Sequence, residues 1–124
     1  MKINEAQQIL EAEVIVGADM LDAEAEVGCA ADLMSDMLAF GKPDSLLLTG
    51  LTNPQVVHTA EVCDIKAICF VRGKKPEART VKLASEAKII LMTTHLPMYE
   101  SCGRLYKHGL PGIGYLDITK NGRK

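Results

Sequence analysis

The sequence predicts an α/β domain with three layers, in which helices cover both faces of a four-stranded, mainly parallel sheet. Four short segments are apolar on successive residues rather than on alternate ones, as expected of strands with both faces buried. Segments with the 3.6-residue period of amphipathic helices lie between them. The last three apolar segments begin 21 and 22 residues apart, which is typical of strand–helix units. The strands are expected at residues 14–16, 46–48, 67–71 and 89–92.

The helical segments are recognised by their apolar stripes and by the residues that precede them. At the N-terminus, Asn4 with Gln7 resembles a capping box, which predicts a short helix before the first strand. Asn53 stands directly before Pro54, and this pair predicts the N-cap and the first turn of a later helix. The further apolar stripes predict helices over residues 30–38, 56–63, 78–84 and 98–106.

Two segments interrupt this alternation of strands and helices. Residues 17–29 lengthen the connection after the first strand and carry four acidic residues. Residues 109–124 are rich in glycine and contain a short apolar run before a basic end. We therefore expect one α/β domain over residues 1–108 and a C-terminal tail over residues 109–124. The tail is expected to add an edge strand, to pack on a partner subunit, or to stay mobile.

Charge and composition exclude several classes of function. The 124 residues include 14 Lys and Arg against 16 Asp and Glu, a net charge of −2, and 4% are aromatic. Nucleic-acid-binding domains usually present a basic face and stacking rings, so we expect no nucleic-acid partner. No apolar run approaches the roughly 20 residues that span a bilayer, and the first residues do not resemble a signal peptide. We expect a cytoplasmic protein without a membrane partner.

Four predicted loops follow the strands, and the sequence places a candidate ligand site among them. Ligands of open parallel α/β sheets bind at the carboxyl ends of the strands, where helix N-termini point. The hydroxyls, glycine amides and cations of these loops suit a phosphate or another small anion. The first loop contributes Asp19, Asp22 and Cys29. The residues expected to bind the ligand are Thr49, Gly50, Thr52, Asn53, Arg72, Gly73, Lys74, Thr93 and Thr94.

Catalysis is the less favoured interpretation, because no motif brings a nucleophile, a base and an orienting group together. GxxxxGK[ST], GxGxxG followed by a helix, and GxSxG are all lacking, and neither a cofactor nor a metal is expected. The enzymatic alternative uses Cys29, expected in a loop before a helix, as a nucleophile, or uses Asp19 and Asp22 to hold a divalent cation. Another alternative is a structural interaction domain without a small ligand. Asp32 and Asp36 are interpreted as a solvated helix face.

Several segments carry a resemblance to a known family. Residues 14–22 (VIVGADMLD) and 27–39 (VGCAADLMSDMLA) resemble small stand-alone DRTGG-domain proteins, as does Thr93-Thr94 followed by MYESCGRLY at residues 98–106. The similarity covers about residues 5–109. It implies a fold like the N-terminal domain of HPr kinase, a three-layer α/β sandwich. It also places Gly50, Thr52 and Asn53 in the loop where larger DRTGG proteins carry glycine, aspartate and arginine.

The resemblance implies a regulatory or ligand-sensing role, and no catalytic residues are assigned to such domains. DRTGG domains also occur inside phosphotransacetylases and CBS-domain pyrophosphatases. Together with the predicted loops, this favours a non-catalytic regulatory domain that binds a small anionic ligand or a regulatory protein partner. We also expect a homodimer, because Met34, Met37 and Met98 are adaptable apolar residues that suit an interface as well as a core.

Overall fold

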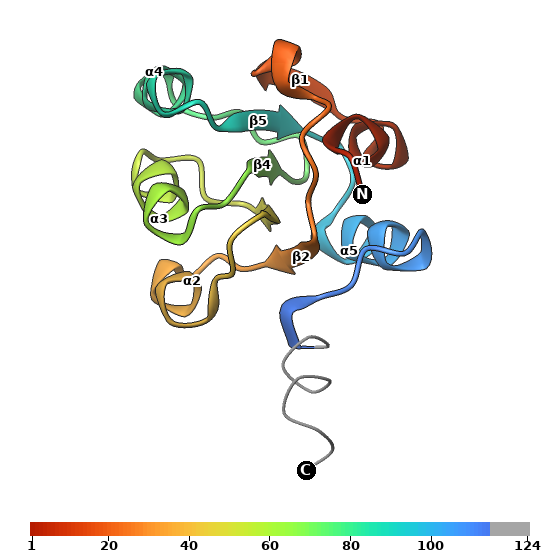
Figure 1. The fold of residues 1–124 in the computed structure, drawn as a ribbon. Helices are drawn as coiled ribbons and strands as arrows, with labels where there is room; N and C mark the ends of the chain where they lie inside the picture. Colours follow the sequence, from red (N-terminus) through yellow and green to blue (C-terminus); the bar gives the residue numbers. More distant parts are fainter. Residues whose placement is uncertain (115–124) are drawn as a thin grey trace.

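Five strands form a single mixed sheet in the order β1-β5-β4-β3-β2, with helices on both faces (Figure 1). The computed structural model describes residues 1–114. The strands are β1 (Glu13–Val16), β2 (Val27–Ala30), β3 (Ser45–Thr49), β4 (Ala67–Phe70) and β5 (Ile90–Thr93). The helices are α1 (Ile3–Leu10), α2 (Met34–Phe40), α3 (Gln55–Cys63), α4 (Ala78–Ala87) and α5 (Met98–Lys107), with a short 3-10 helix η1 (Ala18–Met20). The α/β class is confirmed, with one strand more than the four predicted.

Successive residues of the central strands point into two separate cores. Helices α1 and α5 cover one face of the sheet, and α2, α3 and α4 cover the other (Figure 1). In β3, Leu46 and Leu48 pack toward α1 and α5, whereas Leu47 packs toward the three helices of the opposite face. Strands β3, β4 and β5 are buried along their whole length. Their uninterrupted apolar runs are explained by this coverage, because a strand between two helical layers buries both of its faces.

The first predicted strand runs opposite to the expected direction. β1 pairs antiparallel with β5, with Glu13 opposite Thr93. Its last residue therefore lies level with the amino ends of the parallel strands, which is also where β2 begins. A parallel β1 would end level with the carboxyl ends of the other strands. The chain would then need a crossover connection of roughly a dozen residues or more, usually helical, to return to the start of β2. The chain has only residues 17–26 for this connection, and the 3-10 turn η1 is their only helix.

The second strand, β2, lies in a segment that we expected to be a connection and the start of a helix. It is the edge strand next to β3 and runs parallel to it. Gly28 and Ala30 are small residues with low strand propensity, so the sequence signal for a strand is weak. The segment forms a strand because the side chain of Val27 is buried and because it pairs with the backbone along the edge of β3. Helix α2 accordingly begins only at Met34.

The two predicted side-chain caps do not form. Helix α1 begins at Ile3, whose N–H donates to the backbone carbonyl of residue 23, and the N–H of Asn4 donates to the carbonyl of residue 21. Gln7 donates instead to a backbone carbonyl just beyond the end of the helix, at 3.1 Å. The side-chain oxygen of Asn53 is buried without a hydrogen-bond partner. Tertiary contacts of the surrounding segments therefore replace the local caps that the sequence suggests.

Residues 110–112 lie along the outer edge of β2. The N–H of Gly28 donates to the carbonyl of Pro111 at 2.8 Å, and the side chain of Leu110 is buried in the core beneath α5. The remainder of the predicted tail, residues 115–124, lies outside the described residues, and so does the choice among its three expected roles. Among residues 1–114, no helix is long and apolar enough to cross a bilayer.

Candidate functional site

The loops that follow β3, β4 and β5 meet at one edge of the sheet, as predicted. The N–H of Val71 donates to the carbonyl of Thr49 at 3.1 Å, and the N–H of Gly73 donates to the carbonyl of Thr94 at 2.7 Å. We call this edge the rim and define it as residues 49–53, 71–77 and 93–96. All of the residues predicted to bind a ligand lie on it. Their placement together is established, and ligand binding stays a prediction.

The first predicted loop, by contrast, does not reach the rim. Because β1 is antiparallel, Gly17 lies against the start of β5, and the N–H of Glu26 donates to the carbonyl of Asp44 just before β3 (2.8 Å). Both contacts are at the amino ends of the parallel strands. Asp19 and Asp22 are exposed at this opposite edge. Within residues 1–114, no group of three or more His, Cys, Asp or Glu residues is arranged to hold a metal ion, so the proposed cation loop has no structural support.

Asp32, which we interpreted as part of a solvated helix face, has a specific place at the rim. It precedes α2, and its Oδ1 accepts a hydrogen bond from the N–H of Gly50 at 2.7 Å and another from the hydroxyl of Thr49 at 3.1 Å. A carboxylate from the chain itself therefore occupies two of the donors predicted for an external anion. In the sequence, Asp32 is an acidic residue directly after β2, a strand that we did not predict. Its place at the rim follows only once β2 is recognised as a strand.

The threonine hydroxyls of the rim bond to other parts of the fold. Thr94, which is 2% exposed, donates to the carbonyl of Leu10 at 2.6 Å and accepts from the N–H of Leu96 at 3.2 Å. Thr93 donates to the carbonyl of Lys74 at 2.6 Å. These two hydroxyls therefore fix the loops in place and are not free to bind a ligand.

Two cations of the rim remain available. Arg72 and Lys74 are exposed, and within the described part of the chain neither of them forms an ion pair. Their neighbour Lys75 pairs with Glu13 at 3.1 Å. Arg72 and Gly73 adopt left-handed conformations (φ 59° and 69°), and their N–H groups donate within the rim to Leu96 and Thr94. The turn thus offers side-chain charges rather than free amides.

The loop after β3 contacts the start of α4. The carbonyl of Thr52 accepts hydrogen bonds from the hydroxyl of Thr80 at 2.7 Å and from the N–H of Glu77 at 3.1 Å. Asn53 follows, with its buried and unpartnered side-chain oxygen. Thr52 therefore holds the rim to α4 through its backbone carbonyl, whereas the carbonyl of Asn53 accepts from the N–H of Val56 in α3. The predicted role of Asn53 as a side-chain cap is wrong.

Cys29 lies in β2 and not in a loop before a helix. Burial raises the pKa of its thiol to about 12, and its Sγ lies 3.8 Å from the carbonyl oxygen of Leu46. A catalytic cysteine needs the opposite shift, because the thiolate is the nucleophile. The arrangement therefore gives no support to the enzymatic alternative that uses Cys29.

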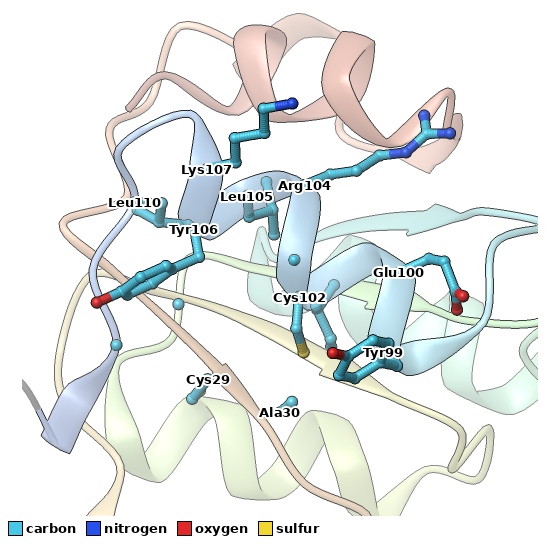
Figure 2. A pocket seen from close by; sticks show the side chains of 14 residues that line it. Cys29, Ala30, Tyr99, Glu100, Cys102, Arg104, Leu105, Tyr106, Lys107 and Leu110 are labelled. Atoms are coloured by element: carbon cyan, nitrogen blue, oxygen red, sulfur yellow. The ribbon is translucent and has the colours of Figure 1, made fainter.

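A groove between β2 and α5 is a feature that the sequence did not predict. It has a volume of about 590 Å³ and is lined mainly by apolar atoms (Figure 2). Tyr99 and Tyr106 lie at its two ends with Cys102 between them, while Arg104 and Lys107 point away from it (Figure 2). The apolar stripe that predicts the helix over residues 98–106 ends at Tyr106, but this side chain is 67% exposed. In the sequence, the seven-residue spacing of Tyr99 and Tyr106 was the only indication of an exposed face along α5.

The methionines on which we based a homodimer are mostly buried. Met34 and Met37 are 4% and 3% exposed and pack in the core beneath α2. Met98 is half-buried against the opposite core. These side chains therefore stabilise the fold of one chain, and the expected homodimer needs a different surface.

Comparison with known proteins places the fold. No protein-family model and no curated protein matches the sequence. Among solved structures, the chain is similar to the regulatory region of Clostridium perfringens pyrophosphatase, which contains CBS and DRTGG domains and was crystallised with its activator, diadenosine tetraphosphate. The TM-score is 0.70 at 16% identity, over 92% of this chain and 49% of that one. The chain thus spans about half of that structure, and the similarity confirms the expected DRTGG-like fold.

Proposed function

We propose that this chain is a non-catalytic regulatory domain that senses a small anionic ligand at the rim, and that Asp32 occupies the site until the ligand displaces it. The fold similarity supports a regulatory role, because the similar region belongs to a pyrophosphatase and binds a phosphate-bearing activator. The observation that carries the proposal is the pair of hydrogen bonds from Thr49 and Gly50 to the carboxylate of Asp32. These two donors of the rim already bind one anion, the carboxylate of Asp32, which belongs to the chain itself.

A phosphate oxygen accepts the same hydrogen bonds as a carboxylate oxygen. The N–H of Gly50 and the hydroxyl of Thr49 lie within 2.7 and 3.1 Å of one oxygen atom, so they converge on a single point. Asp32 is exposed and Gly50 is half-buried, so a ligand that displaces Asp32 approaches the N–H of Gly50 from solvent, whereas Thr49 is buried behind it. The donors need no rearrangement when one oxygen replaces another.

The two free cations supply the attraction that favours a ligand over Asp32. Arg72 follows Val71, whose N–H bonds to Thr49, so the β4 loop adjoins the donors. Arg72 presents a planar fork that suits phosphate, and Lys74 adds a second positive charge. A ligand with two or more negative charges gains from both cations, whereas the single carboxylate of Asp32 forms no ion pair with either.

Displacement of Asp32 connects the ligand to the surface of α2. Asp32 lies between β2 and α2, and its hydrogen bonds tie this connection to the rim. Leu33, Leu38 and Phe40, which follow it, are 61%, 57% and 64% exposed. We propose that a regulatory protein partner recognises this apolar surface and that the ligand changes its position. The two binding events are then coupled, and each changes the affinity of the other by the same factor.

The test measures thermal stability and binding heat with inorganic phosphate, acetyl phosphate and ATP as probes. A probe at 100 times its dissociation constant adds about 2.7 kcal/mol of stability, or about 10 °C in Tm for a domain of this size. The variant Asp32→Asn removes the competing charge. Unit charges about 4 Å apart in water interact by about 1 kcal/mol, so we expect roughly fivefold tighter binding.

Matched variants separate the rim from general charge effects. Asp36→Asn removes the same charge from the first turn of α2 without touching Thr49 or Gly50, and we expect it to bind the probes like the wild type. The double variant Arg72→Ala/Lys74→Ala is expected to lose binding. If Asp32→Asn and Asp36→Asn behave alike, or if neither the wild type nor Asp32→Asn responds to any probe, the rim is not the ligand site.

A further inference from the structure

The groove between β2 and α5 exposes an apolar surface along the described chain. Tyr99 and Tyr106, at its two ends, are 85% and 67% exposed, and Cys102 between them is half-buried. Leu48 and Leu110 contribute to the apolar lining of its volume of about 590 Å³. A contiguous apolar surface of this kind usually marks a contact with another segment or another molecule.

The last described residues enter this groove and run along it. Leu110 and Gly112 belong to its lining, and Leu110 is buried in the core beneath α5. Gly112 pairs with Gly28 in a parallel bridge, so the chain leaves Gly112 in the direction of β2, toward Ala30. Helix α5 returns across the sheet in the opposite direction, so this path leads from the Tyr106 end of the groove toward the other end (Figure 2).

The residues that follow Gly112 suit an apolar groove in composition and in length. Ile113 is already half-buried, and Tyr115, Leu116 and Ile118 add further apolar side chains. The two ends of the groove lie seven helical residues apart, or about 10 Å. Six residues span about 9 Å as a helix and about 20 Å when extended, so residues 113–118 reach along the groove in either conformation.

We propose that residues 115–118 of the same chain cover the groove, with Leu116 and Ile118 packed against its apolar lining. The covalent connection through Gly112 favours this occupant. It makes the contact intramolecular, with an effective concentration in the millimolar range for a short connection. A second molecule would have to lose its translational and rotational freedom to occupy the same place. The groove lies on the face of α1 and α5, and the proposal does not depend on anion binding at the rim.

The experiment measures how fast Cys102 of the full chain reacts with N-ethylmaleimide at pH 8, with peptide mass spectrometry to identify the labelled residue. Cys102 lines the groove between its two ends, so a segment that covers the groove shields the thiol. The apolar-segment variant Leu116→Asp/Ile118→Asp places two charges in the contact and should release the segment. We expect Cys102 to react about tenfold faster in this variant, as for a segment that is bound about nine-tenths of the time.

Three controls accompany this measurement. Cys63 is also half-buried but lies in α3 on the opposite face of the sheet, so its rate should be the same in both proteins. The charge control Asn121→Asp/Gly122→Asp adds two charges just beyond the apolar run and should leave the rate of Cys102 unchanged. Ala30→Asp changes the groove itself at an exposed residue of its lining, and it should speed the labelling of Cys102 as the apolar-segment variant does.

Several results would overturn the proposal. One is an equal rate at Cys102 in the wild type and in the apolar-segment variant. Another is an equal increase at Cys63, because the whole fold would then have opened, or an increase in the charge control, because apolar packing would then not be the cause. Protection of Cys102 that falls when the protein is diluted would assign the cover to a second copy. The response of the rim to phosphate, acetyl phosphate and ATP is measured separately, so the two proposals can fail independently.

Discussion

Replacing Thr94 by valine tests whether the rim threonines serve the fold or a ligand. Valine has nearly the same shape as threonine but lacks the hydroxyl. In the native chain this hydroxyl donates to the carbonyl of Leu10, the last residue of α1, and accepts from the N–H of Leu96. The side chain is 2% exposed, so water cannot replace either bond at low cost. Thr94→Val therefore leaves a buried carbonyl and a buried N–H without their partner.

The magnitude follows from these two bonds. A net hydrogen bond contributes about 1 kcal/mol, and a buried group left unsatisfied costs about 1–3 kcal/mol. We expect Thr94→Val to lower the free energy of unfolding by about 2–4 kcal/mol. For a domain of this size, the corresponding fall in Tm is about 8–15 °C. Urea unfolding at equilibrium measures the free energy, with the unchanged slope as evidence of two-state behaviour.

Thr52→Val is the matched control. The hydroxyl of Thr52 makes no hydrogen bond in the described part of the chain, where only its carbonyl is bonded. The same chemical change should therefore alter the free energy of unfolding by less than about 0.5 kcal/mol. A loss below about 1 kcal/mol for Thr94→Val, or equal losses in the two variants, would show that the hydroxyl of Thr94 does not hold α1 to the rim.

Further predictions concern backbone strain, pH and thiol reactivity. Gly17→Ala places a Cβ 2.9 Å from a side chain of β5 at φ 91°, and should lower the free energy of unfolding in urea by about 2 kcal/mol or more. Gly73→Ala, at φ 69°, meets open space and should lower it by about 1 kcal/mol. The hydrogen bond from Arg104 lowers the pKa of Glu11 below its ordinary 4.5. The pair therefore stabilises the fold above pH 4.5 and loses this contribution as the pH falls through the lowered pKa. In Glu11→Gln, the free energy of unfolding should depend less on pH in that range. Cys29, with a thiol pKa of about 12, should react with iodoacetamide at pH 8 far more slowly than a free thiol, as mass spectrometry of the labelled chain would show; a rate equal to that of free cysteine would contradict its burial.

The central strands and their helices could be predicted from the sequence because local and tertiary preferences agree there. Leu46, Leu47 and Leu48 are apolar in succession, and the fold buries all three between two helical layers. The same agreement holds for residues 67–71, which form β4 and its buried extension. The parallel order of these strands brought their loops together, and the predicted site residues are therefore neighbours at the rim.

The edges of the sheet could not be predicted, because neighbouring segments decide their structure. Residues 27–30 have little strand propensity of their own, and they become β2 only beside β3. The direction of β1 depends on the short connection that follows it and not on the four residues of the strand. Both errors concern strands at the edges of the sheet, whose pairing and direction are decided by segments outside the strand itself.

The same limits apply to the candidate site. The predicted loops meet at the rim, and the hydroxyls of Thr93 and Thr94 donate there to backbone carbonyls, one of them as distant in sequence as Leu10. No local pattern indicates such acceptors, and ligand binding by these residues stays a prediction. The carboxylate of Asp32 at the rim was missed, because that residue follows the strand that was not recognised. The groove beside α5 needs β2 as one of its walls, and it was missed for the same reason.

The central claim is that an external anion and Asp32 compete for the N–H of Gly50. It is tested most directly by the amide resonance of Gly50 in ¹H–¹⁵N spectra during titration with ATP. Our account predicts that this resonance is among those that move most, and that Asp32→Asn reaches saturation at roughly one fifth of the wild-type concentration. Movement confined to residues of the α5 groove such as Gly28 and Gly103, with Gly50 unchanged in both proteins, would contradict it.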